Sequence, residues 1–163
     1  MNAIPILPVI FFLGAVHSHG QEVGSLPEVN RSIQEFVEAN MRKKVGSGEC
    51  WDLAAQALDH AQADWDGSYG FGRVIDPLKE PVLPGDIIQF KNVVTRDKSG
   101  NMLREERMPH HTAIVHKVLD EGIYDIAHQN TDITGRKVGV TRFILENIVR
   151  GKATFHRPVV RGE

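Results

Sequence analysis

The chain has 163 residues, a net charge of −2 and 41% hydrophobic residues, which is typical of one globular domain. It contains no basic tract, so nucleic acid is not an expected partner. The protein is expected to be a monomer. Its single cysteine, Cys50, cannot form an internal disulfide.

The first part of the chain has the pattern of an export signal. Residues 4–16 are almost wholly apolar, a length that suits a signal-peptide core and is too short to span a bilayer. Small residues follow, which suits cleavage. We therefore predict a signal peptide over 1–20, a linker over 21–27 and one domain over 28–163. The expected protein is secreted or periplasmic, with no stable membrane span after cleavage.

Apolar residues at helical spacing predict two helices, over 28–43 and 49–63. Gly48 or Ser47 would cap the second helix. Cys50 then lies in the first turn, where free backbone N–H groups and the helix dipole favour an anion. These surroundings predict a lowered thiol pKa and a reactive thiolate. The alternative is a buried structural cysteine.

The rest of the chain is dominated by predicted strands. Residues 63–84 lack a period and predict a long loop, which is either a surface connection or the wall of a groove. Alternating apolar residues predict strands at 87–95, 102–107, 111–118, 123–128, 138–143 and 153–159, turns at 97–101 and 119–122, and a helical turn at 144–150. Helices followed by antiparallel strands predict an α+β domain.

One predicted hairpin gathers polar residues that could serve a cysteine. If the chain turns at residues 119–122, His111 faces Asn130 or its neighbour, and His128 lies on the diagonal. His128 and Asn130 share one face because side chains alternate along a strand. The same residues could instead be a core histidine and a turn asparagine. His110 and His116 are expected to be ordinary surface or edge histidines. A zinc site from these four histidines is a weaker alternative, because no spacing fits a zinc motif.

Four short motifs, in this order, resemble the cysteine- and histidine-dependent amidohydrolase/peptidase (CHAP) domains and the related NlpC-type peptidases. They are Gly48-Glu49-Cys50, Pro84-Gly85-Asp86-Ile87-Ile88-Gln89-Phe90, His110-His111-Thr112-Ala113-Ile114-Val115 and His128-Gln129-Asn130. The resemblance implies a papain-like fold, with N-terminal helices packed on an antiparallel sheet and the nucleophile at a helix start.

Two departures from the CHAP pattern stand out. His128 occupies a position where many CHAP domains have glutamate, although NlpC-type enzymes use a histidine as the third residue. Trp51 follows the cysteine directly, one residue earlier than the CHAP tryptophan. The sequence motifs around Cys50 and Pro84 also resemble those of cysteine-proteinase-like domains of eukaryotic proteins, whose activity is not established.

The resemblance implies an exported cysteine amidase or peptidase that cleaves peptidoglycan or a short peptide through a thioester. Cys50 would be the nucleophile, His111 would form an ion pair with it, and His128 or Asn130 would orient His111. No metal or cofactor is required. The expected oxyanion and substrate-groove residues are Gly48, Glu49 and Trp51. The rival expectation is a non-catalytic binding module that retains the groove.

Overall fold

The computed structural model describes residues 26–99 and 102–160, so the predicted signal peptide lies outside the described residues. Two helices and an antiparallel six-stranded sheet make an α+β fold, as predicted. None of the helices in the described ranges has the length and apolar character to cross a membrane. The elements are α1 (Glu28–Ala39), α2 (Cys50–His60), β1 (Arg73–Ile75), β2 (Ile87–Ser99), β3 (Met102–Asp120), β4 (Ile123–His128), β5 (Gly139–Ile144), the 3₁₀ turn η1 (Leu145–Asn147) and β6 (Ile148–Arg157).

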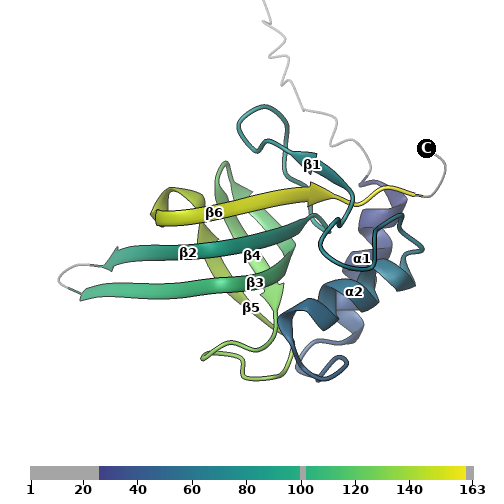
Figure 1. Cartoon of the computed structure of the whole chain (residues 1–163), viewed down its shortest axis with the longest axis horizontal. Helices are drawn as coiled ribbons and strands as arrows, with labels where there is room; N and C mark the ends of the chain where they lie inside the picture. Colours follow the sequence, from purple (N-terminus) through teal and green to yellow (C-terminus); the bar gives the residue numbers. More distant parts are fainter. Residues whose placement is uncertain (1–25, 100–101, 161–163) are drawn as a thin grey trace, which may run out of the picture.

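The sheet has the strand order β1-β6-β2-β3-β4-β5, and every neighbouring pair is antiparallel. Figure 1 shows the two helices together at one end of the sheet, while the β2–β3 hairpin extends away from them. The helices therefore cover only part of the sheet, and the start of α2 meets β3.

The sheet contributes to an apolar core on each face. Ile87 and Ala127 pack with the helices, whereas Ile88 and Phe90 belong to a second cluster that contains no residue of α1 or α2. Neighbouring residues of β2 therefore serve different cores, because side chains alternate across a sheet. Burial on both faces explains why this strand begins as a continuous apolar run.

Several predicted boundaries are wrong. Helix α1 ends at Ala39 rather than residue 43, because the Asn40 amide donates to the Phe36 carbonyl at 2.8 Å and Arg42 has a φ of 63°. The N-cap of α2 is Glu49, not Gly48 or Ser47. Its backbone N–H donates to the Asp52 carboxylate at 3.1 Å, which satisfies a donor at the helix start.

The strand predictions differ from the structure in several places, and β2 runs to Ser99, past its predicted end at 95 and into the predicted turn at 97–101. The long loop contains a short strand, β1, which pairs with β6. The two strands predicted at 102–107 and 111–118 form one strand, β3, that passes through Pro109. Strand β6 begins at Ile148, five residues before the predicted start of that strand. By contrast, β4 has the predicted bounds.

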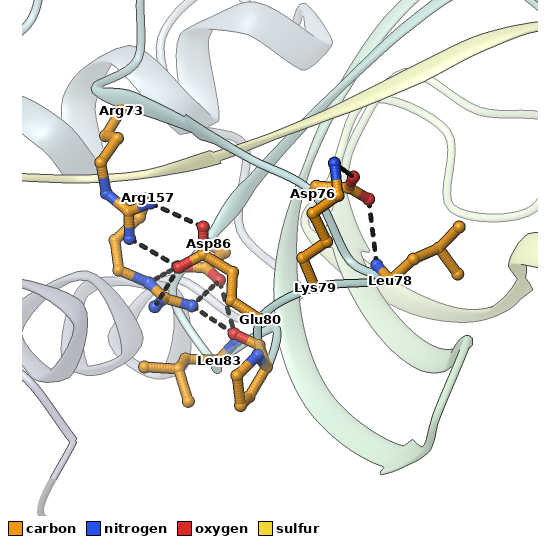
Figure 2. A network of polar contacts seen from close by, with 9 residues as sticks. Arg73, Asp76, Leu78, Lys79, Glu80, Leu83, Asp86 and Arg157 are labelled. Atoms are coloured by element: carbon orange, nitrogen blue, oxygen red, sulfur yellow. Dashed lines mark hydrogen bonds and ion pairs between the residues drawn. The ribbon is translucent and has the colours of Figure 1, made fainter.

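The Pro84-Gly85-Asp86 turn connects β2 to α1 and to the end of β6. Asp86 is fully buried, and its carboxylate accepts a hydrogen bond from Asn30 at 3.0 Å. It also accepts two hydrogen bonds from Arg157, at 2.8 and 3.0 Å (Figure 2). Gly85 has a φ of 88°, and a Cβ there would lie 2.6 Å from the backbone oxygen of Asn30. These contacts therefore fix the positions of α1, β2 and the end of β6 relative to one another.

Candidate active site

Cys50 is the first residue of α2 and is only partly exposed. Strand β4 ends at His128, which leaves the facing edge of β3 without a strand partner near Thr112. Helix α2 contacts β3, and the backbone N–H of Thr112 is close enough to act on the pKa of the Cys50 thiol. The cysteine therefore lies near the backbone of Thr112, the residue that follows His111 in β3.

The pKa of the Cys50 thiol is raised, contrary to the prediction. Burial is the largest cause, and the Glu49 carboxylate adds to it. The backbone N–H groups of Thr112, Trp51 and Cys50 lower this pKa, but their effect is smaller than that of burial and Glu49. The prediction considered the helix start and left out burial and the neighbouring acid.

His111 and His128 form a buried pair on one face of the β3–β4 hairpin. Nε2 of His111 lies 3.0 Å from Nδ1 of His128, and Nε2 of His128 lies 3.0 Å from the Thr141 hydroxyl on β5. The pairing of Ile114 with Ala127 gives the predicted register and places these rings on the diagonal. Thr141 was not predicted, because the pairing of β4 with β5 has no local sequence signal.

Both imidazoles are held in the neutral form. Burial lowers the pKa of His111 to about 4, and burial together with the charge of His111 lowers that of His128 to about 3. Each neutral ring carries one N–H. If His111 donates from Nε2 to His128, and His128 donates from Nε2 to Thr141, Nδ1 of His111 is left as an acceptor.

This geometry does not support the expected ion pair. A raised thiol pKa and a lowered imidazole pKa both favour the uncharged forms of Cys50 and His111. Among the described residues, no hydrogen bond joins the sulfur to an imidazole nitrogen. The thiol of Cys50 and the imidazole of His111 are therefore both neutral at rest.

The segment that follows β4 fastens the loop before Cys50 to the sheet. The side-chain NH₂ of Gln129 donates to the carbonyl oxygens of Val45 at 2.9 Å and Glu49 at 2.8 Å, and its oxygen accepts from the Val45 N–H at 3.2 Å. Gln129 is fully buried. It therefore fixes the start of α2 relative to His128. Its place in a recognised motif was the only sequence signal for this role.

Asn130 does not bond to His111. Its side-chain nitrogen donates to Glu49 at 2.6 Å, and Arg136 donates to the other Glu49 oxygen at 2.9 Å. Arg136, which was not predicted, also donates to the Ser47 carbonyl at 2.6 Å. The Glu49 carboxylate is thus held by two side chains beside the cysteine.

The remaining predicted residues surround the start of α2. Gly48 has a φ of 93°, and a Cβ there would lie 2.9 Å from the Arg136 side chain, so glycine fits this turn. The Trp51 indole donates from Nε1 to the Ser68 carbonyl at 2.7 Å. This bond holds part of the long loop against the helix, next to the cysteine.

The other two histidines lie apart from the His111–His128 pair. His110 is exposed and packs edge-on against Tyr69 with ring centroids 4.7 Å apart. His116 lies 3.4 Å from the Glu38 carboxylate. Within residues 26–99 and 102–160, no group of three or more histidine, cysteine, aspartate or glutamate side chains could hold a metal ion.

Two short helices on an antiparallel sheet, with a cysteine at a helix start and a histidine on the adjoining strand, define a cysteine-proteinase-like domain. Residues 27–162 match the family model of the AIM3/BBC1 cysteine proteinase-fold domain, and the chain belongs to this family. The protein "Altered inheritance of mitochondria protein 3" of the yeast Debaryomyces hansenii is 30% identical over 151 residues. The match covers 80% of this chain but only 16% of that protein.

Two solved structures show a loose similarity. "The crystal structure of Ly7917" has 17% identity and a TM-score of 0.45, with 78% of this chain and 62% of that chain covered. "The crystal structure of Ly7917 with the hydrolyzing product of MDP" has 18% identity and a TM-score of 0.46, with 79% and 62% covered. These similarities are too distant to support an inference about chemistry.

The family match corrects two expectations. The cysteine-proteinase fold is confirmed, including the resemblance to eukaryotic domains, but membership of the CHAP or NlpC groups is not shown. The predicted secreted or periplasmic location is wrong, because the yeast relative is named for the inheritance of mitochondria, a process inside the cell. The apolar run at 4–16 suggested export through its length and composition alone.

Proposed function

We propose that this domain is a cysteine-dependent hydrolase that cleaves amide bonds in peptides. The observation that carries the proposal is the chain of contacts from Thr141 through His128 to His111, on the strand that adjoins Cys50. Such a chain can hold one imidazole in a fixed orientation and tautomer, as nucleophilic catalysis by a thiol requires.

In the proposed reaction, the Cys50 sulfur attacks the amide carbon while its proton moves to Nδ1 of His111. The proton then passes to the leaving nitrogen as the carbon–nitrogen bond breaks, which leaves a thioester on Cys50 and releases an amine. Water adds to the thioester, again with His111 as base, and the acid product leaves with the thiol restored. Proton transfer accompanies attack because the resting thiol and imidazole are both neutral.

Backbone groups at the start of α2 are the proposed oxyanion donors. The N–H groups of Cys50 and Trp51 lie in the first turn, where a helix has no internal acceptors for them. An oxygen that becomes negative next to the Cys50 sulfur would meet these donors and the positive end of the helix dipole. Loss of one such donor can lower a rate by about 100-fold or more.

Peptides are favoured over peptidoglycan as substrates. The Debaryomyces hansenii relative is named for the inheritance of mitochondria and not for an action on a cell wall. The open groove beside Trp51 has a volume of about 900 Å³, which leaves room for several residues of a peptide chain.

A non-catalytic binding module is the second candidate. The raised pKa of Cys50 favours it, because a thiol that stays protonated is a poor nucleophile. In that case, the paired histidines would serve only to hold the hairpin, and Cys50 would be a partly buried structural residue.

A library of fluorogenic peptide amides separates the two candidates. The parent protein should release fluorophore from a subset of peptides, and Cys50→Ala should release none while retaining the same melting temperature. Full turnover in Cys50→Ala would exclude Cys50 as the nucleophile. If neither protein cleaves any peptide but both bind some of them, the domain is a binding module.

A further inference from the structure

An open groove with a volume of about 900 Å³ runs along the outer side of α2, next to the candidate active site. One wall is the exposed side of the helix, and the other is the loop at residues 65–67. Trp51 lines the groove at the end nearest Cys50, the residue that precedes it. Cys50 itself does not line it. The groove thus extends from the site rather than containing it.

Two indole rings form the aromatic part of the groove, and each is held in place. The rings of Trp51 and Trp65 have centroids 5.8 Å apart. Nε1 of Trp51 donates to the Ser68 carbonyl at 2.7 Å, and Nε1 of Trp65 donates to the Asp59 carboxylate at 2.9 Å. With their N–H groups used inside the protein, the rings present faces that suit a cation or an apolar chain.

The groove is acidic. Three of its ten lining residues are aspartates, and none is lysine, arginine or histidine. Hydrogen bonds from the backbone N–H groups of Gly70 and Ser68 lower the pKa of Asp66. Asp59 and Asp66 each use Oδ1 in these internal bonds, and no hydrogen bond within the described residues reaches their Oδ2 atoms. One oxygen of each carboxylate is thus available to a ligand.

We propose that this groove binds an extended polypeptide segment through a lysine or arginine side chain. The cation lies between the Trp51 and Trp65 rings and the carboxylates of Asp59 and Asp66. The methylene stem covers the indole surface, since long basic side chains pack their stems on apolar surface. The groove is larger than one side chain, and the amides of Gln56 and Gln62 along it can bond the peptide backbone.

The continuity of the groove with Trp51 gives the bound segment a direction. A chain whose basic residue is anchored against the two tryptophans passes the start of α2, where Cys50 and its N–H groups lie. In a hydrolase this arrangement selects substrates with a basic residue near the cleaved bond. Binding itself does not require turnover, so the groove has the same ligand in a binding module.

The test uses the whole chain with Cys50→Ala, which removes hydrolysis from the measurement. The probes are fluorescein-labelled peptide amides of alanines with one central lysine, arginine, norleucine or glutamate, measured by fluorescence anisotropy. The lysine and arginine peptides should bind about ten-fold more tightly than the norleucine peptide. Added salt should reduce this difference. Equal affinities for lysine and norleucine would overturn the proposal.

Variants then locate the site. Asp59→Asn and Asp66→Asn keep an oxygen at the position that accepts the internal hydrogen bonds, so the groove should retain its shape and lose the preference for lysine. Asp97→Asn, an exposed carboxylate on the β2–β3 hairpin, is the matched control and should change nothing. An unchanged preference in both groove variants would contradict the proposal. Free cadaverine and unlabelled lysine peptide should also be compared as competitors of the labelled peptide. If cadaverine competes as strongly as the peptide does, the groove binds small amines rather than a polypeptide, and the proposal is overturned.

Discussion

His111 and His128 are two imidazoles with little contact with water, bonded to each other and to one threonine hydroxyl. A lone buried imidazole leaves polar nitrogens unsatisfied, whereas this row satisfies three of the four ring nitrogens. The remaining nitrogen, Nδ1 of His111, is the atom that the proposed reaction uses. In this arrangement His128 is a positioning residue, because it acts through His111.

We expect His128→Ala to lower kcat by about 100-fold with little change in KM, because a freely turning base is misplaced at the moment of proton transfer. His128→Asn should restore much of the rate, since its Oδ1 can stand where Nδ1 of His128 accepts the bond. Steady-state kinetics on the best peptide from the fluorogenic library measures both. A His128→Asn rate as low as that of His128→Ala would show that the acceptor atom is not what matters. Asn130→Ala is the comparison variant, and its effect should be small because Asn130 bonds to Glu49 instead.

The same pair predicts how stability depends on pH. The pKa values of about 4 for His111 and about 3 for His128 lie below the ordinary value of 6.5. At pH values between about 4 and 6.5, the unfolded chain binds more protons than the folded one. The free energy of unfolding therefore falls as pH drops from about 6.5 towards 4. Thermal unfolding across this range should show a smaller fall in His128→Asn. An identical slope in the variant would contradict a buried, neutral His128.

At the scale of elements, the Pro84-Gly85-Asp86 turn joins four parts of the chain. Asp86 bonds to Asn30 on α1, Arg157 at the end of β6 and the Leu83 N–H. Arg157 in turn donates to the Pro81 carbonyl at 2.6 Å. One of the motifs that carried the family resemblance is therefore structural. It positions β2, and through β2 the strand that holds His111.

Removal of the Asp86 carboxylate should destabilise the fold strongly. Asp86→Ala leaves the mostly buried Arg157 without its main partner, which costs about 3–5 kcal/mol in comparable buried pairs. Urea unfolding measures the change. Glu105→Ala, which removes the partner of Arg96 and Arg107 on the exposed hairpin, should have little effect. Equal destabilisation by the two substitutions would show that the buried Asp86 contacts stabilise the fold no more than an exposed ion pair does.

Elements with a regular local pattern were predictable from sequence. Features that depend on pairing with distant residues were not. Strand β4 is short and bounded by a turn, so its limits were correct. Strand β3 was divided because Pro109 lacks an N–H and reads as a break. In the structure Pro109 falls opposite Asn92, where a φ of 52° interrupts the pairing of β2 with β3, so no donor is needed there.

In the candidate site, too, some features were predictable from the sequence and others were not. The register of the β3–β4 hairpin could be counted from its turn, so the diagonal placement of His111 and His128 followed from sequence. The raised pKa of Cys50 could not be predicted, because it depends on burial by segments distant in sequence. Gln129 and Arg136 bond to residues eighty or more positions away in the sequence, and no local pattern encodes such contacts.

For the whole molecule, the two helices and the sheet form one unit that the AIM3/BBC1 family model covers from residue 27 to 162. The relative from Debaryomyces hansenii is far longer, since the match covers only 16% of it. A domain of this kind can act as one module of a larger protein. The groove beside Trp51 would then allow it to recognise a basic segment of that protein or of another one.

The central claim is that Cys50 and His111 act together, with the proton moving between them as a bond forms at sulfur. A peptidyl epoxide tests this directly, because opening the ring requires a nucleophile and a proton donor at once, whereas iodoacetamide requires the thiolate alone. Mass spectrometry of the intact protein should show rapid addition of the epoxide to Cys50 and addition slower by about 100-fold in His111→Ala. Iodoacetamide in alkaline buffer should label both proteins equally. Equal epoxide rates in the two proteins, or no reaction in either, would contradict a catalytic Cys50–His111 pair.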